Sequence, residues 1–181
     1  GNFINEKYGF SMDEPDKWIV AGNEALLKNL DKFELTEEVL TKFISENNGS
    51  ILLTSYYKYN PQKHAGLIPT IQVHVRANSS KTFEAFKERM VQSAQGARQY
   101  FEDFSFVVEP EEIDISGVRS IFFVGTFSMQ TQNAGIVHVR SRTYAIPYGS
   151  YFFQLNFTDG QFKEDNSELF DALIQTVKIG R

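Results

Sequence analysis

The sequence predicts an α+β fold: a single domain over residues 1–181, with an antiparallel sheet of about six strands flanked by helices on both faces. Consecutive extended segments joined by short turns fill the stretch from Phe104 to Thr158, which favours antiparallel pairing over a regular alternation of strand and helix. The segment Ser120–Ser128 is apolar on both faces, so we expect it at the centre of the sheet with helices on each side. No internal repeat, low-complexity tract or linker divides the chain.

Residues 1–77 are expected to contribute short strands, two helices and then two longer strands. Apolar residues recur at helical spacing in Asn23–Phe33 and in Thr36–Glu46. Apolar and polar residues alternate in Ile71–Ala77, the pattern of a half-buried strand. The other extended segments of this region are Tyr8–Met12, Trp18–Val20 and Ile51–Tyr57.

A long helix is expected from about Lys81 to Phe101, after the potential capping residues Asn78, Ser79 and Ser80. Its apolar residues recur every three or four positions and form a narrow stripe, which is typical of a helix that packs one face on a sheet. We therefore expect four of its residues to be buried and two to be exposed: Phe83, Phe86, Met90 and Phe101, against Glu84 and Arg98.

Two short strands, Phe104–Val108 and Ile113–Ile115, are expected on either side of a turn at Pro110. The C-terminal stretch is expected to form a hairpin of Gly135–Ile146 with Tyr151–Thr158, followed by an amphipathic helix. Asp165 and Glu168 mark the helix start. The apolar stripe of this helix is Leu169, Phe170, Leu173, Ile174 and Val177.

The register of the hairpin decides which side chains share a face. We expect Pro147 opposite Tyr151, with an odd-length loop or a bulge and Gly149 at positive φ. An even loop would bury Arg140 and His138 beside the aromatic row, and without partners they would cost several kcal/mol. If Ile71–Ala77 lies beside this hairpin, the expected register gathers the candidate binding residues on one polar surface: His74, Arg76, His138, Arg140, Arg142, Gln154 and Asn156.

Two imidazoles and three guanidiniums on one surface would suit a carboxylate, a phosphate or an acidic protein partner. The competing interpretation is that these polar strand faces are simply solvated. His64 lies in the polar loop Asn60–Gly66, where a solvent-exposed histidine is expected.

Composition excludes several classes of protein. The chain has a net charge of −5 and no cysteine, so it has no disulfide, catalytic thiol or thiolate metal site and no basic face that indicates nucleic acid. Three dispersed histidines and the lack of phosphate-binding or nucleophile-elbow motifs leave no catalytic residue, cofactor or transition metal to propose. The acidic turns Asp13–Asp16 and Glu109–Asp114 could supply oxygen ligands, but neither has EF-hand spacing. No apolar run approaches the ~20 residues that span a bilayer.

Two patches of packing residues carry a family resemblance. Near the start stand Tyr8-Gly9-Phe10-Ser11, Pro15 and Trp18, and near the end stand Arg142 to Tyr151, Phe157, Phe170 and Val177-Lys178-Ile179. Together they resemble the Mog1/PsbP-like superfamily, including DcrB-type and lipoprotein-like bacterial relatives. The resemblance covers both ends and the strand order, and it implies a sheet sandwiched by helices, no shared catalytic residue, and a role as adaptor, chaperone or assembly factor.

These observations favour a non-catalytic protein-binding, chaperone or assembly module of an exported bacterial protein, with a protein partner, no nucleic acid and no cofactor. The alternative is a small-ligand carrier or enzyme that uses a pocket near His74, His138 and Arg140. A deep cavity where these three converge would favour the alternative, whereas a broad polar surface would favour protein binding.

The location of the protein is a further expectation. The chain begins at Gly1 without a methionine, so we expect that a secretory signal, in one version ending in a lipid-anchored cysteine, has been removed. A periplasmic or membrane-anchored lipoprotein is therefore expected, with a cytoplasmic protein as the alternative.

Overall fold

The computed structural model of the chain describes residues 1–22, 37–131 and 134–180, so the helix expected over Asn23–Phe33 lies outside the described residues. The described helices are α2 (Glu37–Glu46), α3 (Phe83–Tyr100) and α4 (Ser167–Ile174). The described strands are β1 (Asn2–Asn5), β2 (Phe10–Asp13), β3 (Ile19–Val20), β4 (Ser50–Tyr57), β5 (Thr70–Ala77), β6 (Ser105–Ile115), β7 (Val118–Thr131), β8 (Gly135–Tyr148), β9 (Tyr151–Gly160) and β10 (Lys178–Ile179).

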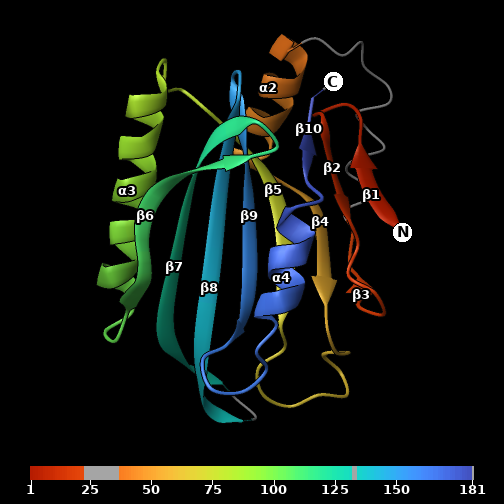
Figure 1. Ribbon diagram of the computed structural model, residues 1–181, viewed down its shortest axis with the longest axis vertical. Coiled ribbons are helices and arrows are strands. Elements are labelled where there is room, and N and C mark those ends of the chain that lie inside the picture. Colours follow the sequence, from red (N-terminus) through yellow and green to blue (C-terminus); the bar gives the residue numbers. More distant parts are fainter. Residues whose placement is uncertain (23–36, 132–133, 181) are drawn as a thin grey trace.

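The predicted α+β class with an antiparallel sheet is confirmed (Figure 1). The main sheet has seven strands in the order β3-β4-β5-β9-β8-β7-β6, and every neighbouring pair is antiparallel. It exceeds the expected size by one strand because the two-residue β3 adds to its edge. A second sheet, β1-β2-β10, joins strands from the two ends of the chain.

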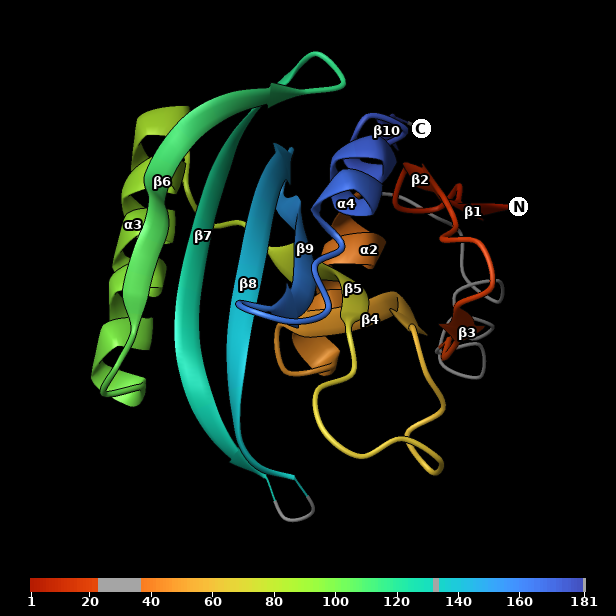
Figure 2. The same cartoon turned by 60° about the horizontal axis from the view of Figure 1, so that its bottom comes forward.

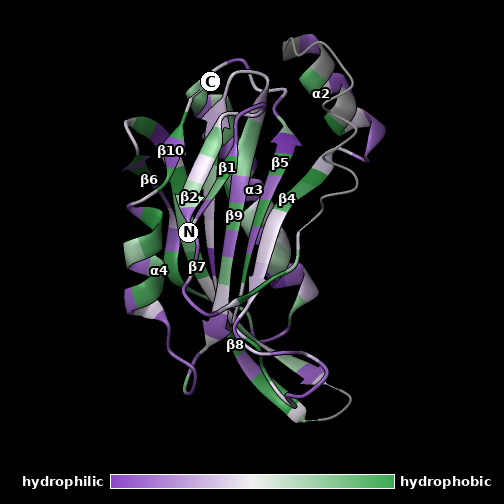
Figure 3. Ribbon diagram, turned by 90° about the vertical axis from the view of Figure 1, so that its right-hand side faces the viewer, coloured by the Kyte–Doolittle hydropathy of each residue, from purple (hydrophilic) through white to green (hydrophobic). Residues whose placement is uncertain are grey.

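The helices lie on both faces of the main sheet, as expected (Figure 2). We call the two sides the α4 face and the α3 face. On the α4 face, Phe153 and Leu155 of β9 belong to one core with Phe10 of β2, Leu40 of α2 and Phe170 of α4. Residues alternate between the faces along β9, and the hydrophobic and hydrophilic bands in Figure 3 follow this two-residue period.

Helix α3 occupies the other face and packs over β6, β7 and β8. It begins after Thr82, whose hydroxyl accepts a hydrogen bond from the Ala85 amide at 3.1 Å, and not after the earlier expected caps. Phe86 is 1% exposed and meets Phe152 edge to face, with ring centroids 5.3 Å apart. The predicted burial is confirmed for Phe86, and Glu84 and Arg98 are exposed as expected. Phe83, Met90 and Phe101 were expected to be buried but are only half-buried.

The strand predicted as central is interior but lies next to the edge. β7 has only β6 beyond it, and β9 is the middle strand of the sheet. Both faces of β7 are nevertheless covered, because Ile121 packs under α3 and Phe122 stacks on Tyr144 on the α4 face. β6 also differs from the expectation: it runs continuously through Pro110, with register irregularities on both sides of Val108 in place of a turn.

The predicted hairpin register is wrong. Tyr148 pairs with Tyr151, so the β8–β9 loop is the even-length Gly149-Ser150, with Gly149 at φ 63° as expected. Pro147 therefore lies opposite Phe152, one position away from its expected partner. This shift of one residue exchanges the faces of every β8 side chain relative to β9.

Candidate functional site

The exchange of faces divides the predicted binding residues into two groups. The α3 face carries His74 and Arg76 of β5 together with Gln154 and Asn156 of β9. The α4 face carries His138, Arg140 and Arg142 of β8. His74 therefore lies on the opposite face from His138 and Arg140, and these three side chains do not converge. The prediction of a single polar surface is wrong, and so is the prediction of a pocket near these three residues.

The arginines on the α4 face anchor α4 and its preceding loop to the sheet. Arg140 donates two hydrogen bonds to Asp159 at 2.9 and 2.7 Å, and a third to Asp165 at 2.9 Å. Arg142 donates to Asp171 of α4 at 3.0 Å, and its guanidinium lies 5.7 Å from the centroid of the Phe170 ring. These contacts satisfy the charges, so the expected penalty for burying unpaired arginines does not arise.

Electrostatic shifts agree with this structural role. Hydrogen bonding to Asp159 raises the pKa of Arg140 despite its partial burial. The pKa of the Asp165 carboxyl falls to about 2, first because it accepts hydrogen bonds from the Ser167 side chain and backbone, and also because Arg140 lies beside it. Arg140 and Arg142 are therefore occupied by internal carboxylates.

The remaining residues form what we call the open polar face: Gln72, His74 and Arg76 of β5 with Gln154 and Asn156 of β9. All are half-buried, and His74 lies opposite Gln154 in the sheet. Gln154 donates to the Asn156 amide oxygen at 2.8 Å, and Asn156 donates to the Thr143 hydroxyl at 2.9 Å. These hydrogen bonds hold the two β9 amides in one arrangement.

Two members of this face carry polar atoms without partners. Among the described residues, the buried Nδ1 of His74 and the buried Nε of Arg76 have no hydrogen-bond partner, and Arg76 forms no ion pair. Burial lowers the pKa of both side chains, and the neighbouring Arg76 charge lowers that of His74 further. The face is therefore a cationic surface centred on Arg76.

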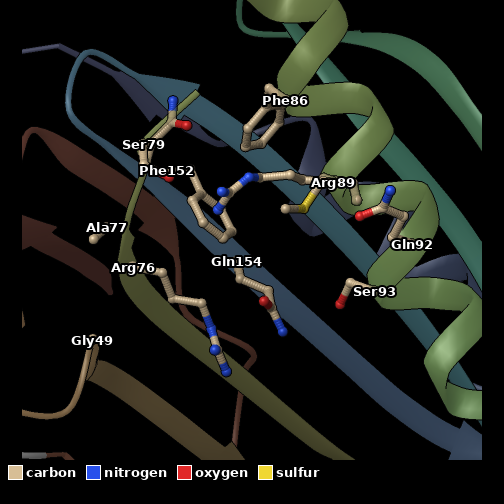
Figure 4. Close-up of a pocket in the computed structure, with 12 residues that line it drawn as sticks. Gly49, Arg76, Ala77, Ser79, Phe86, Arg89, Gln92, Ser93, Phe152 and Gln154 are labelled. Carbon is tan, nitrogen blue, oxygen red and sulfur yellow. The ribbon is translucent and has the colours of Figure 1, made fainter. Parts of the chain in front are cut away.

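A cavity of about 540 Å³ opens between this surface and α3. Arg76 and Gln154 line it from the sheet, and Arg89 and Ser93 line it from the helix (Figure 4). The sequence interpretation missed Arg89, because it is one charge among several on the polar side of α3. Two guanidiniums around one cavity suit a carboxylate or phosphate, which arginine binds through paired hydrogen bonds.

His138 lies in a different hollow, on the opposite side of the sheet. A cavity of about 460 Å³ there is lined by His64, His138, Phe162 and Glu164, among others. His138 is held by Ser128, whose hydroxyl lies 3.0 Å from Nδ1, and its ring meets Phe162 edge to face. His64 stacks on Tyr59 with ring centroids 4.4 Å apart, so it also has a packing role.

Two further observations concern metals and membranes. Within residues 1–22, 37–131 and 134–180, no three His, Cys, Asp or Glu side chains gather closely enough to hold a metal ion. None of the described helices combines the length and apolarity that crossing a membrane requires.

Comparison by sequence finds no matching protein-family model and no matching curated protein. Comparison by structure does find relatives in fold. Cyanobacterial PsbP (CyanoP) from Synechocystis sp. PCC 6803 matches with a TM-score of 0.58 at 10% sequence identity, over 99% of this chain and 92% of that chain. The chain has a PsbP-like fold. The sequence resemblance to the Mog1/PsbP-like superfamily is thus confirmed at the level of fold.

Two other solved structures also match the chain in the structural comparison. One from Bacteroides thetaiotaomicron VPI-5482 matches with a TM-score of 0.51 at 12% identity, over 99% of this chain and 48% of that chain, so our chain spans about half of it. LpqN, described as involved in cell envelope biogenesis of Mycobacterium tuberculosis, matches at 16% identity over 74% of this chain and 80% of that chain. The TM-score of this match is 0.47.

Proposed function

We propose that this chain is a non-catalytic protein-binding module of the chaperone or assembly type, and that the open polar face receives an acidic segment of its partner. The observation that carries the proposal is Arg76, a half-buried guanidinium for which the described residues supply no carboxylate. An unpaired cation at such a site costs stability, and a partner that brings a carboxylate removes that cost on binding.

The shape of the surface supports a protein partner. Its polar side chains come from two adjacent strands, and the two β9 amides are held by hydrogen bonds to each other and to Thr143, so this part of the surface is preorganised. Phe86 and Phe152 line the adjoining cavity as buried rings, so they hold α3 in place beside the polar side chains. A preorganised polar patch with an arginine anchor is typical of protein interfaces.

The contrast with the α4 face also favours this assignment. Arg140 and Arg142 each form an ion pair with an aspartate of the same chain, whereas the described residues supply no ion-pair partner to Arg76. We also propose export to the periplasm or anchoring as a lipoprotein, on the sequence resemblance to lipoprotein-like relatives. Fractionation of cells that produce the full-length protein tests this second part.

Photo-crosslinking in the native cells tests the binding surface. A benzophenone side chain at Gln72, on the open polar face, should form one discrete adduct with an acidic protein. The same group at Gln175, an exposed residue at the end of α4, should not form this adduct. The Gln72 adduct should disappear with Arg76→Glu and persist with Arg98→Glu, a charge reversal at an exposed arginine outside this face. An adduct that forms equally from Gln175, or that survives Arg76→Glu, would refute the assignment.

A further inference from the structure

A second cavity lies beside the first one beneath α3. It has a volume of about 230 Å³ and is lined by Ala97, Phe101, Phe104, Phe123 and Phe127, among others. Ser93 lines both cavities, so they are neighbours along the helix. We use the word groove for these two neighbouring cavities taken together, with a cationic end at Arg76 and an aromatic end at Phe101.

The sequence explains why space remains under this half of the helix. At its start α3 faces the sheet with the large side chains of Phe86 and Met90, but it then presents Ala94 and Ala97. The sheet opposite also carries small residues, since Ser141, Thr143 and Gly125 line the same cavity. Small residues on both walls leave a channel where large ones would interdigitate.

Aromatic rings close the far end of the channel. Phe101 stacks on Phe127 with ring centroids 4.0 Å apart, and Phe104 stacks on the same ring at 6.3 Å. Phe104 also covers Gly125, where a Cβ atom would lie only 2.3 Å from the Phe104 ring. This end of the groove is therefore an apolar compartment suited to a hydrocarbon chain.

We propose that the groove binds a single-chain anionic amphiphile, with its carboxylate between Arg76 and Arg89 and its alkyl chain beneath α3. From Ser93 to Phe101 the helix rises about 12 Å, which is the extended length of a medium-length alkyl chain. The guanidiniums of Arg76 and Arg89 would bind the negatively charged headgroup, and the aromatic end of the groove would enclose the alkyl tail. This inference does not depend on a protein partner and is tested on the purified chain alone.

The test is calorimetric titration with decanoate below its micelle concentration, with acetate as the headgroup alone and decyl maltoside as the tail with a neutral head. Decanoate should bind at one site, and the other two should bind at least tenfold more weakly, because each lacks one half of the contacts. Arg76→Gln should weaken decanoate binding tenfold or more, whereas the matched helix variant Arg98→Gln, which lines neither cavity, should leave it unchanged.

A second variant tests whether the aromatic end of the groove holds the alkyl tail. Ser93→Leu places a large side chain at the residue that lines both cavities, at an exposed helix position that tolerates leucine, and should also weaken decanoate binding at least tenfold. Ala97→Phe, which fills the compartment itself, provides a further variant, and circular dichroism checks that each is folded. The proposal would be overturned if decanoate does not bind or if acetate binds with the same affinity as decanoate. It would also be overturned if decanoate binding is unchanged in both Arg76→Gln and Ser93→Leu.

Discussion

Asp159 should be one of the most costly polar residues to remove. Its side chain is 0% exposed, and it accepts two hydrogen bonds from Arg140 and one from the Asn166 backbone amide at 2.7 Å. Asp159→Ala would leave a guanidinium that is only 17% exposed without its main partner, and would leave a buried amide without an acceptor.

The size of the effect follows from these contacts. Removing one partner of a buried ion pair costs about 3–5 kcal/mol. Arg140 keeps its bond to the exposed Asp165, which places the expected loss near the lower end, at about 3 kcal/mol. With a urea slope of about 2 kcal/mol per molar, the unfolding midpoint should fall by roughly 1.5 M.

Urea unfolding followed by circular dichroism measures this shift. The matched control is Glu112→Ala, which breaks the Arg119–Glu112 pair, because that pair has the same 2.7 Å separation but is exposed on both sides. It should show little change in midpoint. If Asp159→Ala shifts the midpoint no more than Glu112→Ala does, the reasoning that burial gives the Arg140 pair its importance is refuted.

Three further predictions concern packing, pH and metals. Phe86→Ala should cost about 3–5 kcal/mol in the same urea assay, because the 1%-exposed ring packs on Phe152, and a loss under about 1 kcal/mol would contradict the packing of α3 on the sheet. The pKa of His74 is lower in the folded chain than its ordinary value of 6.5, so the unfolded state binds more protons and the free energy of unfolding should fall as pH drops from 7 to 5. His74→Gln should flatten this dependence, and an unchanged slope would show that another group is responsible. A chelator should leave the melting temperature unchanged, and a drop of several degrees would reveal a structural metal.

Much of the fold could be predicted from periodicity. The helical spacing of Phe86 and Met90 and the alternation in Ile71–Ala77 reflect one buried face, which local sequence records directly. The position of β7 could not be predicted in the same way. An apolar strand requires cover on both faces, but this cover can come from α3 on one side and from Tyr144 on the other while the strand lies next to the edge.

The candidate site could be predicted only in part, because its geometry depends on pairs that are distant in sequence. The expected register rested on the cost of burying Arg140 without a partner. That cost is removed by Asp159 and Asp165, which lie 19 and 25 residues away along the chain. A β-hairpin with acidic residues at the end of its second strand and just beyond it is therefore a signal that buried arginines are compatible with an even loop. Arg89 carried no comparable signal, since its role depends on how α3 lies over the sheet.

The most direct test of the account is the affinity of the crosslinked partner for the purified chain and its variants. The account predicts that Arg76→Glu weakens binding at least tenfold, because it replaces the unpaired cation of the open polar face with a repelling charge. Arg98→Glu, with the same change of charge at an exposed position of α3, should leave the affinity within about twofold at physiological salt. Equal weakening by the two variants, or no weakening by Arg76→Glu, would contradict the claim that this face is the binding surface.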